Sequence, residues 1–288
     1  MFTTYLAMTI NCKGRLLDLS TPLVMGILNL TPDSFHDGGK YRDMDEILRH
    51  TEQMLTEGAD IIDIGGMSSK PGSKIIAIEE ELARVIEPIK AIQKHFRDAI
   101  LSIDTIHAQV AEAALENGVS IVNDISAGAM DEGMIPTVAR LGTPYIIMHM
   151  QGTPENMQDA PFYTNVVTEV MDNLAERVRV CRIAGIKDII IDPGFGFGKT
   201  NEHNFQLLKG LSLFKMLSCP MLAGLSRKSM ITKTLGIKNA DALNGTTVLN
   251  TIALLNGTNI LRVHDVKEAK EAVKLVAEIG KSGNSGIG

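Results

Sequence analysis

The residues best placed to do chemistry begin at Asp192, where an apolar run meets a glycine-rich loop. The segment Asp188–Asp192 holds three isoleucines in a row, which is typical of a parallel strand buried on both faces. Pro193 and the alternating glycines after it disfavour both strand and helix, so the chain must turn there. Asp192 is therefore predicted to lie at the carboxyl end of a buried strand, where α/β proteins keep ligand sites.

This glycine-rich loop does not match either common nucleotide-binding pattern. A P-loop ending at Gly198-Lys199-Thr200 would need a glycine at the position of Pro193. The dinucleotide-binding pattern, counted from Gly194, would place its third glycine at Lys199. The loop is glycine-rich without being a nucleotide loop.

Polar groups also end the other predicted strands. In a parallel barrel all carboxyl strand ends open on one face, so these groups are expected to converge on a functional mouth. They are Asn29, the segment 63–66, Asp104, Asn123 with Asp124, His149, Asp192, the loop 226–229, and Arg262 with His264.

Three of these groups predict a site for a flat ring. Asp104, Asn123 and Asp192 are acceptors or mixed amide groups, so a matching ligand presents several N–H donors and some acceptors on one edge. An aminopyrimidinone ring has such an edge, with its 2-amino group and ring N–H facing a carboxylate.

Asn29, Arg262 and His264 predict an opposite end that binds an anion. They suit a phosphate or diphosphate, with Mg²⁺ held by one side-chain oxygen. The alternative for Arg262 and His264 is a structural pair at a strand end. Local positive charge is expected from three further residues, Lys199, Arg227 and Lys228.

These groups need elements to position them, and the chain repeats a short apolar strand, a loop and an amphipathic helix. Eight such strands favour a single (β/α)₈ TIM barrel, with an open doubly wound sheet as the competing architecture. A β-hairpin is expected ahead of it, from Tyr5–Asn11 and Leu16–Leu19. We expect one domain over residues 1–280 and a mobile tail over 281–288. The predicted strands are Val24–Asn29, Asp60–Gly65, Ile100–Asp104, Ser120–Ile125, Tyr145–His149, Asp188–Asp192, Met221–Leu225 and Asn259–His264.

Composition narrows the class of partner and the compartment. The net charge of −6, with no basic block, disfavours nucleic acid as a partner. No run is long and apolar enough to predict a membrane span. The three cysteines are odd in number and form no Cys-x-x-Cys, which favours a reduced, cytoplasmic protein. His149 is interpreted as a packing histidine at the barrel mouth rather than as a metal ligand.

The motifs at the strand ends resemble those of the dihydropteroate synthase family, in the family's order. The resemblance runs from Val24 to the last helix. It is carried by the segments 25–35, 63–66 with 69–72, 102–105, 123–125, 192–199, 226–229 and 262–264. It implies the synthesis of 7,8-dihydropteroate and diphosphate from 6-hydroxymethyl-7,8-dihydropterin diphosphate and 4-aminobenzoate, in folate biosynthesis.

The resemblance also implies roles for individual residues. Asn29 would bind Mg²⁺ and diphosphate, and Arg262 would cover the pterin and meet the diphosphate with His264. The pterin pocket would consist of Asp104, Asn123, Asp192 and Lys228. The 4-aminobenzoate end would consist of Ser69, Lys70, Pro71, Phe197 and Ser229. Within this set Asn29, Asp104, Asp192, Lys228, Arg262 and His264 are the candidate catalytic residues, acting by positioning and electrostatics, because the sequence offers no nucleophile–base pair.

The sequence departs from the family pattern at Ser69-Lys70, where the family usually has Thr-Arg. Ser69 keeps the hydroxyl group and Lys70 keeps the positive charge, so an active enzyme with a looser loop is expected.

Rival interpretations are a pterin-dependent methyltransferase, which would not need the diphosphate end, and a catalytically silent homologue. Apolar stripes on the last two helices suggest a homodimer.

Overall fold

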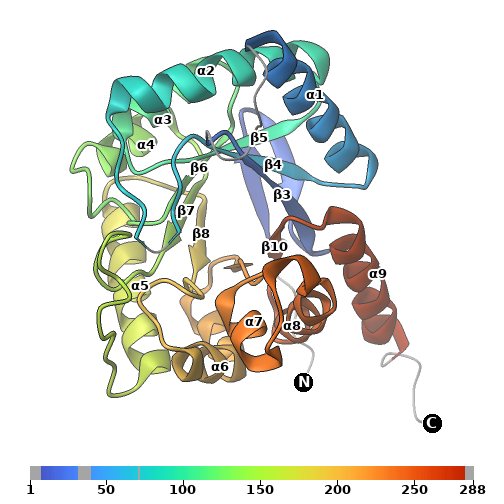
Figure 1. The fold of residues 1–288 in the computed structure, drawn as a ribbon. Coiled ribbons are helices and arrows are strands. Elements are labelled where there is room, and N and C mark those ends of the chain that lie inside the picture. Colours follow the sequence, from blue (N-terminus) through green and yellow to red (C-terminus); the bar gives the residue numbers. More distant parts are fainter. Residues whose placement is uncertain (1–7, 32–39, 71, 283–288) are drawn as a thin grey trace.

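In the computed structural model, which describes residues 8–31, 40–70 and 72–282, eight parallel strands surround one axis (Figure 1). Every predicted strand is present, and no observed strand end differs from the predicted one by more than two residues. The strands are β3 (Leu23–Asn29), β4 (Ile61–Gly65), β5 (Ile100–Asp104), β6 (Ile121–Asp124), β7 (Tyr145–Met148), β8 (Ile189–Asp192), β9 (Leu222–Ala223) and β10 (Ile260–Val263).

The order of the strands decides between the two predicted architectures. It runs β8-β7-β6-β5-β4-β3-β10-β9, so neighbours in sequence are neighbours in space except where β10 returns to β3. The remaining gap is bridged by a parallel contact between Ile191 and Met221 and by the Ile191 N–H, which donates to the Pro220 carbonyl over 2.9 Å. The predicted (β/α)₈ barrel is confirmed, and the open doubly wound sheet was the wrong alternative.

Helices cover the outside of the barrel with their apolar stripes inward. In α2, Val85, Ile89 and Ile92 lie on one face of the helix and are fully buried. The helices are α1 (Lys40–Thr56), α2 (Ile78–His95), α3 (Ala108–Glu116), α4 (Met134–Leu141), α5 (Val166–Ile183), α6 (Asn201–Lys209), α7 (Ser229–Leu235), α8 (Leu243–Leu255) and α9 (Val266–Ser282), with 3₁₀ turns at Leu211–Leu217 and Asn239–Asp241.

The interior of the barrel changes from apolar to polar along the strands. Because side chains alternate between the two faces of a strand, residues two apart point into the same interior. Near the amino ends of the strands the interior is filled by an apolar cluster, called here the lower interior cluster. Its strand residues include Ile61, Ile100, Ile121, Ile190 and Ile260. Two residues further along the same five strands stand Asp63, Ser102, Asn123, Asp192 and Arg262.

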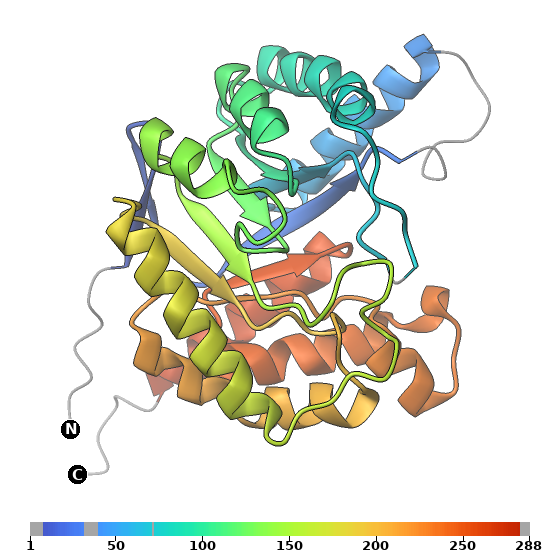
Figure 2. The same cartoon turned by 90° about the vertical axis from the view of Figure 1, so that its left-hand side faces the viewer.

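The predicted hairpin closes the apolar end of the barrel. It is formed by β1 (Thr9–Cys12) and β2 (Arg15–Asp18), joined by a tight turn in which Lys13 and Gly14 both have positive φ, 53° and 88°. Its predicted first residues, 5–7, lie outside the described residues. Ile10, Cys12 and Leu19 pack into the lower interior cluster. Figure 2 shows the hairpin at the left, opposite the end to which the strand arrows point. The hairpin therefore covers the end of the barrel interior opposite the carboxyl ends of the strands.

The C-terminal end differs slightly from expectation. Helix α9 continues to Ser282, two residues beyond the predicted domain end at 280, so residues 281 and 282 belong to the helix rather than to the tail. The rest of the predicted tail, 283–288, lies outside the described residues. Over the described ranges, none of the helices has both the length and the apolar character needed to cross a bilayer.

Candidate active site

The candidate residues meet at the polar end of the barrel because of the strand register. Gly65 on β4 is the register partner of Asn29 on β3 and of Asp104 on β5, and Asp104 is in turn the partner of Asn123 on β6. A Cβ atom on Gly65 would stand 3.6 Å from the Asn29 Oδ1 and 3.7 Å from the Asp104 Cβ. The glycine therefore leaves room between the two sides of the mouth.

Arg262 lies at the centre of this end, tied to two carboxylates. Its Nε donates to the Asp63 Oδ2 and its Nη2 to the Asp104 Oδ2, each over 2.6 Å. Asn123 donates its Nδ2 to the same Asp63 oxygen over 3.0 Å. Arg262 is part of a charged network across the mouth, which is more than the isolated pair with His264 that we left open. The strand-end position of Asp63 predicted that it lies at the mouth, but not that it binds Arg262 and Asn123.

The two site carboxylates are held in a low-dielectric environment. Burial raises the pKa of Asp104 to about 7; Arg262 opposes the shift, while Asp63, Glu81 and Asp124 add to it. Burial also raises the pKa of Asp192, and the Gly194 N–H, which donates to its Oδ1 over 2.8 Å, opposes it. Both groups therefore gain from a ligand that supplies N–H donors.

Lys228 supplies positive charge at the mouth, as expected. Its ammonium donates to the Phe195 carbonyl and lies 4.3 Å from the centroid of the Phe197 ring, within cation–π distance. Gly196 has a φ of +83°, and a Cβ there would stand 3.0 Å from the Lys228 side chain. The glycine-rich loop therefore packs against the Lys228 side chain, whose charge acts on Asp192.

Lys199 and Arg227 act on the mouth through their charge, Lys199 on Asp192 and Arg227 on His264, but both are bound by other groups of the protein. Lys199 is 3% exposed and donates to the carbonyls of Gly194 and Phe197, over 2.8 and 3.0 Å. Arg227 makes a two-bond ion pair with Asp265, over 2.7 and 2.9 Å. Arg227 is bound by a residue 38 positions away, and Lys199 is bound by carbonyls of its own loop. The sequence pattern does not reveal either contact.

His149 and His264 have different surroundings. His149 is buried, and burial lowers the pKa of its ring to about 3. Its Nδ1 lies 3.0 Å from the Lys199 Nζ, which agrees with a packing histidine. The His264 Nδ1 lies 3.0 Å from the Ser226 Oγ, which also accepts the His264 backbone N–H over 3.2 Å. Ser226 is buried and orients the ring of His264, a contact that the sequence did not predict.

The loop that follows β4 carries the residues expected at the second-substrate end. Ser69 is half-buried and Lys70 exposed, and Pro71 lies outside the described residues. The loop is joined to the loop after β7 by the Gly72 N–H, which donates to the Pro154 carbonyl over 2.9 Å. Ser229, by contrast, is exposed at the first residue of α7.

For a magnesium ion, the candidate side-chain ligand at the barrel mouth is Asn29. Among the described residues no group of three or more His, Cys, Asp or Glu side chains is placed to hold a metal. Asn29 presents one amide oxygen beside the space that Gly65 leaves. Mg²⁺ commonly binds through one or two side-chain oxygens together with substrate phosphates and water. Asn29 therefore fits an ion that arrives with a diphosphate.

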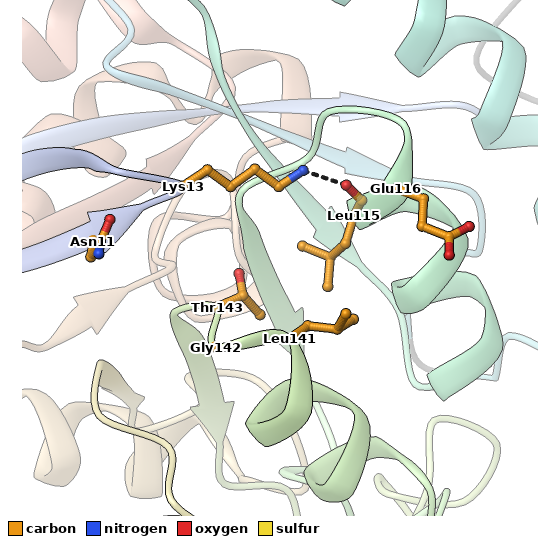
Figure 3. A pocket seen from close by; sticks show the side chains of 7 residues that line it. All are labelled: Asn11, Lys13, Leu115, Glu116, Leu141, Gly142 and Thr143. Atoms are coloured by element: carbon orange, nitrogen blue, oxygen red, sulfur yellow. Dashed lines mark hydrogen bonds between the residues drawn. The ribbon is translucent and has the colours of Figure 1, made fainter.

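A separate pocket lies at the closed end of the barrel. It is bounded by the hairpin and by the C-terminal ends of α3 and α4, and the Lys13 ammonium crosses it to the Leu115 carbonyl (Figure 3). It lies away from the carboxyl strand ends and is not part of the mouth. Its lining residues are Asn11, Lys13, Leu115, Glu116, Leu141, Gly142 and Thr143.

Comparison with known proteins agrees with this geometry. Residues 25–264 match the model of the family described as pterin binding enzyme. The dihydropteroate synthase of Escherichia coli strain K12 is 42% identical over 271 residues, which cover 93% of this chain and 95% of that protein. The chain belongs to the dihydropteroate synthase family. The family enzyme of Haemophilus influenzae is 43% identical over 270 residues, covering 93% of this chain and 98% of that protein.

Solved dihydropteroate synthases have the same fold. A Yersinia pestis enzyme, described in complex with a sulfonamide drug, has a TM-score of 0.89 and 41% identity, covering 95% of this chain and all of that chain. A Xanthomonas albilineans enzyme described with 7,8-dihydropteroate has a TM-score of 0.85 and 37% identity, covering 95% and 99%. Another structure of that enzyme is described with 4-aminobenzoic acid, at a TM-score of 0.88, 39% identity and 94% and 98% coverage. The match therefore extends over nearly the whole barrel.

Proposed function

We propose that this chain joins 6-hydroxymethyl-7,8-dihydropterin diphosphate to 4-aminobenzoate, giving 7,8-dihydropteroate and diphosphate. The observation that carries the proposal is the division of the barrel mouth. Acceptors from Asp104, Asn123 and Asp192 gather on one side, and Asn29 and His264 lie at strand ends on the other. Family membership supports the same reaction.

The pterin ring would bind among the buried acceptors. Asp104 and Asp192 are each less than a tenth exposed, and a carboxylate in such surroundings favours a ligand edge rich in N–H donors. Lys228 would donate to a ring oxygen or nitrogen. These contacts fix the ring and hold its substituent toward the diphosphate side.

Asn29, Arg262 and His264 would bind the diphosphate. Arg262 can present a planar fork to a phosphate oxygen, and Ser226 orients the His264 ring at the same strand end. Asn29 would also hold Mg²⁺, which supplies positive charge to the leaving diphosphate when bound. The role of these side chains is to favour the charge that develops on the departing group.

The 4-aminobenzoate end would be formed by Ser69, Lys70, Pro71, Phe197 and Ser229. Support comes from Phe197, whose ring lies beside the Lys228 ammonium, and from the loop after β4, which reaches the loop after β7. A ring held there would have its amine facing the pterin methylene. Expelling diphosphate would leave a cation on that methylene, which the electron-rich pterin and the nearby carboxylates can stabilise.

The test mixes purified protein, both substrates and Mg²⁺, and measures diphosphate and dihydropteroate. Formation of both products supports the proposal, and an Asn29→Ala variant should lose most of the rate. Absence of diphosphate would contradict the proposal, and methyl transfer from a methylated pterin would favour the methyltransferase interpretation. A protein that binds pterin but turns over neither substrate would favour the silent homologue.

The order of events can be tested with the pterin diphosphate alone. If the cation forms first, crystals soaked in this substrate should contain free diphosphate beside Asn29, Arg262 and His264 before any amine is added. Intact substrate at every soaking time would favour a concerted displacement.

A homodimer and a cytoplasmic location complete the proposal. Helices α8 and α9 lie side by side (Figure 1) and expose apolar side chains on their outer surfaces: Val248 and Leu255 are 50% and 57% exposed, and Leu275 and Ile279 are 69% and 61% exposed. A second copy would bury them. The cytoplasm fits three buried, unpaired cysteines. Sedimentation of the wild type and of a Leu255→Glu, Leu275→Glu variant tests the dimer.

A further inference from the structure

Asp63 occupies an unusual position for a carboxylate. It points into the barrel from the middle of β4 and is 0% exposed. Aspartate is rarely buried so completely unless it has partners. Among the described residues, one of its oxygens, Oδ1, has no hydrogen-bond partner, and neither has the hydroxyl of its register neighbour Ser102. Burying the Asp63 carboxylate with one oxygen unpartnered costs free energy, so we looked for a role of this side chain other than filling space.

The partners of Asp63 lie on both sides of its strand. β4 is two strands from β6 in one direction and two strands from β10 in the other. The Asp63 Oδ2 accepts the Nδ2 of Asn123 from β6 over 3.0 Å and the Nε of Arg262 from β10 over 2.6 Å. One oxygen therefore joins two proposed substrate residues across the interior.

The contact with Asn123 fixes which end of that amide meets the ligand. A carboxylate can only accept hydrogen bonds, so Asn123 must turn its NH₂ group to Asp63. Its carbonyl oxygen is then the end left for a ligand. Asn123 becomes a third acceptor beside Asp104 and Asp192, and the three acceptors select a ring edge made of N–H donors.

The contact with Arg262 keeps that guanidinium from binding to Asp104 alone. Arg262 divides its N–H groups between Asp63 and Asp104, at 2.6 Å each. Without the Asp63 charge, Asp104 would be the only anion bonded to the guanidinium. Arg262 would then compete with the ring for Asp104.

We infer that Asp63 is a positioning residue for pterin recognition, which sets Asn123 as an acceptor and holds Arg262 back from Asp104. This inference rests on the proposed function. Asp63 acts through its two partners and does not itself touch the substrate.

The first test compares pterin binding to the wild type and to Asp63→Asn by calorimetry, using 6-hydroxymethyl-7,8-dihydropterin diphosphate with Mg²⁺. The variant keeps the shape but can donate to Asn123, which frees that amide to reverse. We expect affinity for the pterin to fall about tenfold to a hundredfold, with the KM for 4-aminobenzoate nearly unchanged. Asp60→Asn is the matched control, because Asp60 precedes the other end of β4 and pairs with Lys270 over 2.6 Å. The control should bind pterin like the wild type.

A double-mutant cycle separates positioning from simple stability. Because Asp63 acts partly through Arg262, Asp63→Asn should cost less affinity in an Arg262→Met background than in the wild type, and the loss that remains is the part that acts through Asn123. The double variant should also melt at a higher temperature than Arg262→Met alone, because it no longer buries an unpaired carboxylate. This keeps the test usable if Asp63→Asn alone folds poorly.

The outcomes distinguish this inference from the proposed function. A wild type that binds no pterin would overturn the proposed function. A wild type that binds pterin, together with an Asp63→Asn variant of equal affinity, would overturn the inference alone. Fully additive losses in the double-mutant cycle would also overturn it, because they would show that Asp63 does not act through Arg262.

Discussion

The buried Lys199 ammonium lies 3.0 Å from the His149 Nδ1 and also binds the glycine-rich loop. It also donates to the carbonyls of Gly194 and Phe197, at the two ends of the turn that packs against the Lys228 side chain. Because burial keeps the His149 ring neutral, its Nδ1 can accept from the ammonium. A buried lysine thus joins two loops of the mouth without reaching the substrate side.

Lys199→Met should therefore loosen the glycine-rich loop. The substitution leaves buried carbonyls without a donor, and each such loss costs about 1–3 kcal/mol. We expect the free energy of unfolding to fall by at least about 1 kcal/mol and the affinity for pterin to fall with it. Urea unfolding and calorimetry measure the two effects. Lys187→Met, at an exposed position, is the control and should change neither; a Lys199→Met variant as stable as the wild type would contradict this role.

Affinity for pterin should fall as the pH is lowered through about 7. Burial raises the pKa of Asp104 to about 7, and the groups around it are Asp63, Glu81 and Asp124, which raise it further, and Arg262, which opposes. Only the ionised carboxylate is purely an acceptor, so protonation removes a site for the ring N–H groups.

The effect of Asp104 on folding stability changes with pH in the opposite direction. The pKa of Asp104 is raised above its unfolded value, so the folded state favours the proton. The contribution of this group to stability is present below the unfolded pKa and is lost as the pH rises through about 7. Calorimetry of pterin binding on both sides of pH 7 tests the binding effect. Asp104→Asn should bind more weakly and lose most of the pH dependence, and an unchanged profile in that variant would assign the dependence to another group.

Asp192→Asn should weaken pterin binding roughly tenfold or more, because it replaces one acceptor by a donor facing ring N–H groups. The remaining oxygen can still accept from the Gly194 N–H, so the loop should keep its shape. Asp188→Asn is a matched control just before the other end of β8, where Asp188 accepts the Asn11 N–H over 2.9 Å. Equal affinity of Asp192→Asn and the wild type would show that Asp192 does not face the ring.

The double variant Ser69→Thr, Lys70→Arg should lower the KM for 4-aminobenzoate and leave affinity for pterin nearly unchanged. Threonine restricts the rotamer of residue 69, and arginine restores a planar fork that can bind a carboxylate by two hydrogen bonds. Steady-state kinetics with each substrate varied in turn measure the effect. Lys74→Arg, at an exposed position further along the same loop, should have no effect. A change in pterin affinity instead would place the loop at the other end of the mouth.

The elements and the position of the mouth could be predicted from the sequence because their signals are local. Each strand is a short apolar run, and the polar residue that ends it stands next to that run, as Asp192 follows three isoleucines. The fold class and the family followed from these runs and motifs, and the structure and the relatives confirm both. Local patterns carry this information because strand burial and side-chain alternation depend on residues close together in the chain.

Partner choice within the mouth was decided only by the tertiary structure. Asp63 and Arg262 are 199 positions apart, and Arg227 and Asp265 are 38 apart. No periodicity shows that Arg262 binds two carboxylates, that Arg227 turns to Asp265, or that Lys199 is buried beneath its own loop. A charged side chain binds whatever opposite charge or carbonyl the closed barrel brings within about 3 Å, and that distance depends on the register of all eight strands together.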